Sequence, residues 1–402
     1  MSPGERTARR TALIFASSQA IVGSAAPITI SLGGLAGVYL LDSDKSLATA
    51  PVTAFMVGTA LGAVPAAMLL RRLGHRTGFI SGCGISALGG FIATIALFEM
   101  SFWLFIAGLF VLGLGASFVQ QFRFAAADAA PPAFKARAIS FVLAGGVITA
   151  ILGPQIVIFT SDLLAPVMFA GAFAATIGTA LVSAIILSFL PPHRPVSQEE
   201  IAAQAPARPL GEILRQPTFA VGLLCGVSTF ALMSLVMTGA PLAMVGCGFT
   251  SEQATLGISW HVMAMFAPSF FTGRLIGMFG RERIVAVGLV MLLGCAVVAL
   301  SGIALWQFWT ALILLGLGWN FGFIGATAMI ADSYQPSEKG KVQGVHDLVL
   351  FGTVAVASLA SGQIYNAWGW DMLNWLVFPV ILVCLLALGV LAGMMRRQAR
   401  AA

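Results

Sequence analysis

The cationic residues of this chain are confined to alternate gaps between long apolar stretches. Of the 21 Lys and Arg residues, all but Lys45 lie in, or within a few residues of, every second gap. Membrane proteins keep cationic side chains on the cytoplasmic face. The alternation therefore predicts a multi-pass helical membrane protein whose two chain ends are both cytoplasmic.

The apolar stretches are long enough to cross a bilayer, which takes about 20 residues each. The chain has 402 residues, of which 59% are apolar and 9% charged, and this composition excludes a soluble globular protein. The expected spans are 11–37, 47–70, 76–98, 101–125, 138–160, 164–190, 217–245, 253–275, 284–302, 305–330, 341–365 and 372–395.

Charge and motif content narrow the class further. The net charge of +6 is explained by orientation in the membrane, so no nucleic-acid partner is expected. The five Cys residues show no metal-ligand spacing, and no phosphate-binding glycine loop or hydrolase motif is present. We therefore expect neither an enzyme nor a bound metal or cofactor.

The two halves of the chain repeat each other. The Pro-rich, charged segment 191–216 has six expected spans on either side, which predicts domains at 1–190 and 217–402 joined by a cytoplasmic linker. Paired six-helix bundles around a central site are the architecture of alternating-access transporters. The matching residues include Gly74 and Gly280, Gly113 and Gly316, Asp128 and Asp332, and Pro27 and Pro241.

Two loop segments carry a family pattern. Residues 67–76 read A-M-L-L-R-R-L-G-H-R and residues 273–282 read G-R-L-I-G-M-F-G-R-E. They resemble the loop G-x-L-x-D-R-x-G-R-R between the second and third spans of the major facilitator superfamily. The frame is kept, but Arg71 and Gly277 stand where that family has Asp. The antiporter pattern of the fifth span survives only as Gly153-Pro154.

The resemblance covers nearly the whole chain and implies an all-α membrane fold. Twelve transmembrane helices would form two pseudo-symmetric six-helix bundles. It also implies that the eleventh span lies beside the second. Arg71 and Asp347 are therefore candidates for a charge-swapped version of a contact between these two spans.

Ionisable residues in apolar spans are costly and are functional candidates. Asp128 and Asp332 lie at the inner ends of the fourth and tenth spans and are expected to form ion pairs when the cytoplasmic side is closed. The alternative for both is a solvated helix end. The expected partners are Arg72 or Arg76 for Asp128, and Arg281 or Arg283 for Asp332.

A histidine and a carboxylate are adjacent near the start of the eleventh span. His346 and Asp347 have uncharged equivalents in the fifth span. One interpretation is an interfacial ion pair that stabilises a single state. The other is a proton relay, because an imidazole beside a carboxylate titrates near neutral pH.

Polar and aromatic side chains near mid-span are candidate solute ligands. Structural alternatives exist for them: a histidine can bond to a carbonyl, an arginine can extend toward the helix end, and a serine can bond within its own helix. The candidates are Gln19, Ser24, Gln120, Arg123, Ser228, Trp260, His261, Trp319 and Asn320.

Together these features predict a monomeric secondary transporter of a small organic solute in the bacterial inner membrane. Protons are the expected coupling ion, and uptake by symport is favoured. The candidate ligands suit a planar, neutral or weakly anionic solute, such as a vitamin or heterocycle of the riboflavin kind. Two alternatives stay open: a proton-coupled exporter of drugs or metabolites, and a transporter-like membrane sensor or assembly partner.

Overall fold

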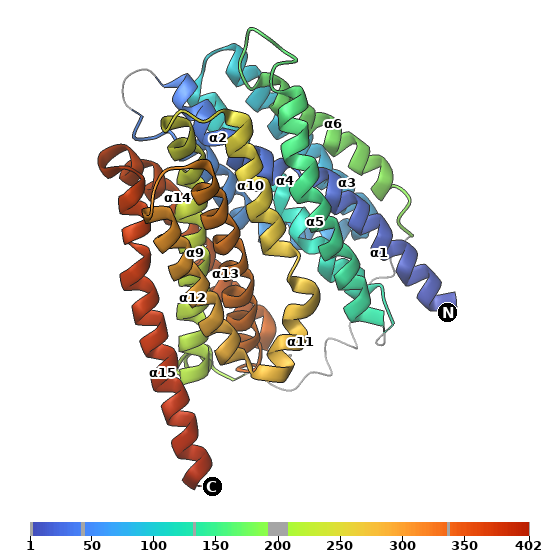
Figure 1. Cartoon of the computed structure of the whole chain (residues 1–402). Helices are drawn as coiled ribbons and strands as arrows, with labels where there is room; N and C mark the ends of the chain where they lie inside the picture. Colours follow the sequence, from blue (N-terminus) through green and yellow to red (C-terminus); the bar gives the residue numbers. More distant parts are fainter. Residues whose placement is uncertain (1–2, 42–44, 132–133, 192–207, 336–337, 402) are drawn as a thin grey trace.

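A computed structural model of the chain describes residues 3–41, 45–131, 134–191, 208–335 and 338–401. The described residues form helices joined by turns, and no β-strand occurs among them. The helices run along one another as an elongated bundle (Figure 1). The prediction of an all-α fold is confirmed.

The first half of the chain contains a broken first span and a long bent pair. α1 and α2 are separated at Gly23 and Ser24. α3 continues through the turn at Gly74, so it contains both the second and the third span. The helices are α1 (Pro3–Val22), α2 (Ala25–Leu40), α3 (Ala50–Phe98), α4 (Phe102–Asp128), α5 (Lys135–Thr160) and α6 (Ala170–Leu187).

The second half follows a short helix at the end of the linker. Its second span is bent by 43° between α10 and α11, where Pro268 removes a backbone donor. The helices are α8 (Leu210–Leu214), α9 (Pro217–Gly246), α10 (Ser251–Phe266), α11 (Ser269–Phe279), α12 (Arg281–Leu300), α13 (Leu305–Ala331), α14 (Lys339–Trp375) and α15 (Val377–Ala401).

The number of spans depends on how bent segments are divided. Among the described residues, 10 segments are long and apolar enough to cross a membrane, or 11 with the bent pair α10–α11. The last of them, Val345–Met395, has 51 residues and contains most of both α14 and α15. A bilayer core is crossed by about 20 residues, so this segment supplies two crossings and the predicted twelve are accounted for.

The sequence repeat reappears in the backbone. Gly74 and Gly280 turn the chain between consecutive helices with φ of 76° and 85°, which side chains rarely allow. At a second pair, a Cβ on Gly113 would approach the Phe55 carbonyl oxygen to 2.2 Å, and one on Gly316 the His261 carbonyl oxygen to 2.4 Å. Glycine therefore permits the same close helix contact in both halves.

Both chain ends run toward the same end of the bundle (Figure 1). We call it the basic end, because the arginines at the start of α1 and the end of α15 lie there. The halves are joined by hydrogen bonds in the part of the bundle away from this end. These are Thr53 Oγ1 to Ser358 Oγ at 3.2 Å, Thr49 Oγ1 to the Leu359 carbonyl at 3.4 Å, and Ser259 Oγ to the Ala150 carbonyl at 2.6 Å.

The end of the linker is fastened to the second half at the basic end. Glu338 is fully buried, and its two carboxylate oxygens accept hydrogen bonds from the Arg208 guanidinium at 2.7 and 2.9 Å. The Ser333 carbonyl accepts further bonds from Arg208 and from Gln216. Segment 208–216 is therefore anchored, whereas most of the predicted linker, 192–207, lies outside the described residues, and the domain boundaries stay a prediction.

Candidate functional site

Four aromatic rings converge inside the second half, and we call them the aromatic cluster. Phe230 lies midway along α9, and its ring centroid is 5.4 Å from that of Trp319 and 5.1 Å from that of Phe323. Trp319 and Phe323 are stacked one helical turn apart on α13, with centroids 5.1 Å apart and an interplanar angle of 19°. Phe351 of α14 is 6.2 Å from Phe230. The rings of Phe230, Phe323 and Phe351 are half-buried.

The aromatic cluster has the chemistry of a site for a flat solute. Trp319 is 9% exposed, and its indole Nε1 has no hydrogen-bond partner among the described residues. A buried N–H usually has an acceptor, so an indole without one is an unsatisfied donor inside the second half. Aromatic faces bind planar rings by offset or edge-to-face stacking.

Opposite charges come close to each other between the two halves, one helical turn before Phe351 of the aromatic cluster. Arg123 of α4 and Asp347 of α14 attract each other electrostatically, although they form no direct ion pair among those the structure describes. The Arg123 side chain is exposed. Its guanidinium carbon lies 4.8 Å from the ring centroid of Phe124. Gln120 is also exposed, and its spacing places it on the same face of α4.

The adjacent pair on α14 forms the contact that its sequence indicates. His346 Nδ1 lies 2.9 Å from Asp347 Oδ1. The His346 ring is buried and its Nε2 has no partner among the described residues, whereas the Asp347 side chain is 52% exposed. The side chain of Arg71 lies outside the described residues, so the predicted pair of Arg71 with Asp347 stays a prediction.

His261 is fully buried between α10 and α13. Its Nδ1 lies 2.9 Å from the Leu312 carbonyl, and its Nε2 has no partner among the described residues. One ring nitrogen of His261 therefore has the structural role predicted as the alternative, a bond to a neighbouring carbonyl. A solute or proton role for the other nitrogen stays a prediction.

Asn320 stabilises the break between α10 and α11. Its amide nitrogen donates to the Met265 carbonyl at 2.6 Å and to Ser269 Oγ at 2.7 Å. Its amide oxygen accepts from Thr272 Oγ1 at 2.6 Å. Both the nitrogen and the oxygen of the Asn320 amide are therefore hydrogen-bonded to residues at the break, and these bonds stabilise the bend.

The structure does not bring the remaining solute candidates to the aromatic cluster. Ser228 borders a groove between α9 and α15, beside Pro379 and Val383. Trp260 is 43% exposed and lies on the face of α10 opposite the buried Val262. The sequence alone does not show which face of a spanning helix points into the protein, because both faces are apolar.

Two further candidates lie at the break in the first span. The Ser24 hydroxyl bonds to the Ile21 carbonyl in the same chain segment. Gln19 lies one turn before the break, where its carbonyl accepts from Thr149 of α5 at 2.7 Å. Both residues therefore shape the junction between α1 and α2, and a solute contact by either stays a prediction.

The predicted gate residues differ between the halves. Arg281 and Asp332 form an ion pair that joins the start of α12 to the end of α13. Asp128, Arg72 and Arg76 are exposed, and no ion pair joins them among the described side chains. The structure therefore contains one of the two predicted contacts, within a single half, and the gating role stays a prediction.

Sequence reasoning missed Phe230, Phe323 and Phe351 and the contact of Arg208 with Glu338. The four-residue spacing of Trp319 and Phe323 was a signal for the stacked pair. The other rings come from helices distant in sequence, and the chain contains 29 Phe residues. Glu338 lies in an expected loop, so its burial had no signal.

Sequence comparison places the chain among known transporters. The family model of the Major Facilitator Superfamily matches residues 11–319 and 248–401. The riboflavin transporter RfnT of Brucella anthropi is 49% identical over 381 residues, covering 95% of each chain. The uncharacterized transporter YddS of Bacillus subtilis is 30% identical over 376 residues, covering 89% of this chain and 85% of that protein.

Solved structures share the architecture. The nucleoside transporter NupG superposes with a TM-score of 0.72 at 12% identity, covering 96% of this chain and 99% of the other. The POT family transporter PepTSo gives a TM-score of 0.72 at 11% identity, covering 98% of this chain and 99% of the other. At these identities the likeness concerns the fold alone. The family model and the relatives confirm the predicted resemblance: the chain belongs to the Major Facilitator Superfamily.

Proposed function

We propose that this chain carries riboflavin into the bacterial cell across the inner membrane by alternating access. The observation that carries the proposal is its 49% identity to the riboflavin transporter RfnT across 95% of both chains. The superfamily fold makes the chain a membrane transporter, and we assign it no catalytic activity.

The aromatic cluster suits the ring system of riboflavin. This solute is uncharged, with a flat tricyclic ring, a carbonyl-bearing edge and a polyol chain. Trp319, Phe230 and Phe323 form an aromatic surface suited to a flat ring, and the buried Trp319 indole N–H has no partner among the described residues. Arg123 lies in the opposite half, where its guanidinium suits a donor role toward the carbonyl edge.

The proposed orientation places the basic end in the cytoplasm, with both termini there. The hydrogen bonds between the halves lie away from this end, which supports an inward-facing state. His346 and Asp347 are the proposed proton-linked pair, because they share a hydrogen bond and Asp347 lies close enough to Arg123 of the opposite half to attract it. We propose that one chain suffices for transport, since the paired residues come from a single chain.

Reconstitution in proteoliposomes tests this proposal. Riboflavin accumulation is measured with a proton gradient directed inward, directed outward or collapsed by an uncoupler. A nucleoside serves as a control solute, because a solved structure of the same fold is named a nucleoside transporter. Riboflavin accumulation with the gradient directed inward supports the proposal. Accumulation only under the opposite gradient would identify an exporter, and absence of riboflavin flux under every condition would reject the function.

A further inference from the structure

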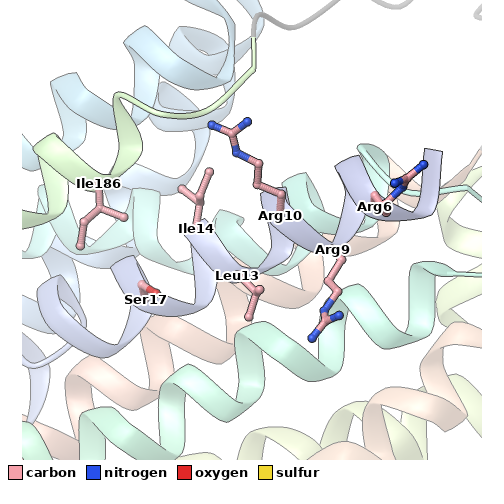
Figure 2. A pocket seen from close by; sticks show the side chains of 7 residues that line it. All are labelled: Arg6, Arg9, Arg10, Leu13, Ile14, Ser17 and Ile186. Atoms are coloured by element: carbon pink, nitrogen blue, oxygen red, sulfur yellow. The ribbon is translucent and has the colours of Figure 1, made fainter. Parts of the chain in front are cut away.

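A basic groove runs along the outer face of α1 at the basic end, beside α6. It has a volume of about 490 Å³ and lies away from the aromatic cluster, in the other half of the chain. Figure 2 shows the guanidinium groups of Arg6, Arg9 and Arg10 spread along this part of α1, with Ile186 of α6 at the far end. The solute site does not use these residues.

The residues of the groove change from charged to apolar along the helix axis. Arg6, Arg10 and Leu13 follow one another at intervals of three and four residues, so they share one face of α1. Leu13 and Ile14 lie farther along the axis of α1 from its N-terminal end than the arginines, at a rise of about 1.5 Å per residue. A ligand that fits this groove therefore has an anionic end and an apolar body.

The arginines carry charge that protein groups do not neutralise by ion pairing within the described residues. Arg6, Arg9 and Arg10 are exposed, and the ion pairs of the described chain involve none of them. Glu5 is the single carboxylate within the same stretch of α1. The local charge is therefore strongly positive at the level where α1 enters the apolar layer.

We propose that this groove binds an anionic phospholipid, whose phosphodiester contacts Arg6, Arg9 and Arg10 and whose acyl chains lie on Leu13, Ile14 and Ile186. The guanidinium group presents a planar pair of donors that matches phosphate oxygens. Basic pockets on the cytoplasmic side of spanning helices attract anionic head groups, while the apolar residues below them face acyl chains. A free phosphate ion would use the arginines and leave the apolar part of the groove uncovered.

Native mass spectrometry of the purified full-length protein tests the proposal. The protein is titrated with dioleoyl phosphatidylglycerol or with dioleoyl phosphatidylcholine, and retained lipid is counted. We expect preferential retention of phosphatidylglycerol. Combined Arg6→Gln, Arg9→Gln and Arg10→Gln should lower its affinity roughly 100-fold, at about fivefold for each arginine. Inorganic phosphate should not displace the bound lipid.

Two control variants make the test specific. Arg215→Gln, Arg274→Gln and Arg397→Gln neutralise three exposed arginines outside the groove, and this variant should retain the lipid. Substitution of Arg6, Arg9 and Arg10 by Lys keeps the charge and should preserve most of the binding. Equal retention of both lipids by the wild type, or undiminished phosphatidylglycerol binding by the triple Gln variant, would overturn the proposal. Displacement by inorganic phosphate would assign the arginines to a free anion and overturn it as well.

Discussion

Arg208 and Glu338 form a two-pronged contact that ties the end of the linker to the loop before α14. The guanidinium donates to both carboxylate oxygens, at 2.7 and 2.9 Å, and the Arg208 backbone N–H donates to one of them at 3.0 Å. The Glu338 side chain is 1% exposed and that of Arg208 is 33% exposed, so the carboxylate depends on these bonds more than the guanidinium does. Breaking one partner of a buried pair costs more than replacing both.

We expect Arg208→Ala to lower the thermal midpoint of the detergent-solubilised protein by several degrees, because it leaves the Glu338 carboxylate buried without its partner. The double variant Arg208→Ala with Glu338→Gln should recover part of the loss. Arg215→Ala removes an exposed arginine seven residues away and is the matched control. A double variant less stable than Arg208→Ala would contradict this explanation.

The same contact has a defined pH dependence. Hydrogen bonds from Arg208 and from the Gln335 backbone N–H lower the pKa of the Glu338 carboxyl from 4.5 to about 2. A carboxyl with a lowered pKa stabilises the folded state above its unfolded pKa and loses this effect as pH falls toward the folded value. The difference in thermal midpoint between wild type and Glu338→Gln should therefore be constant from about pH 5 to 8 and shrink below about pH 4.5. A difference that varies between pH 5 and 8 would point to another titrating group.

Trp319→Ala should weaken riboflavin binding about tenfold, since stacking of a base-like ring on an aromatic side chain is worth roughly 1–3 kcal/mol. Riboflavin fluorescence, titrated with purified protein, gives the affinity. Trp306→Ala on the same helix is the control, because this tryptophan is 61% exposed at the start of α13. Equal affinities of the two variants would remove the aromatic cluster from the solute site.

Charge reversals identify the partner of Asp347. Asp347→Arg alone should abolish riboflavin uptake, because it places two cations against each other across the halves. Adding Arg123→Asp should restore part of the uptake if these two residues form the working pair. Adding Arg71→Asp instead tests the charge-swapped contact predicted from the sequence. Rescue by neither reversal would show that Asp347 acts without a fixed cationic partner.

His346→Gln should separate coupling from translocation. If His346 and Asp347 bind the coupled proton, the variant loses accumulation driven by a proton gradient but still exchanges labelled for unlabelled riboflavin. Glutamine retains a polar group of similar reach, so the Asp347 contact is altered without opening a large cavity. Undiminished gradient-driven accumulation would assign the pair to structure alone.

The fold followed from patterns that act over the whole chain. Alternating cationic gaps set the spans, and the repeated Gly74 and Gly280 reappear with the same left-handed backbone. Individual charged residues such as Arg123 and Asp347 can be identified from the sequence as functional candidates, because a charge in an apolar span is rare. The rotation of each helix was harder to predict, because lipid-facing and protein-facing surfaces are both apolar. Ser228 lies beside α15 and Trp260 on an exposed face of α10, both outside the aromatic cluster, and a solute contact by either stays a prediction.

The aromatic cluster belongs entirely to α9, α13 and α14. When two rigid bodies rock against each other, distances within one body are conserved, so a ring stacked on these side chains would travel with them. Release of the solute on one side would then depend on contacts that the first half loses as it moves. Arg123 of α4 is the charged group of that half that interacts with Asp347 of the second half. Solute binding and the timing of solute release would then depend on different halves of the chain. The second half would bind the solute, and the first half would control when it is released.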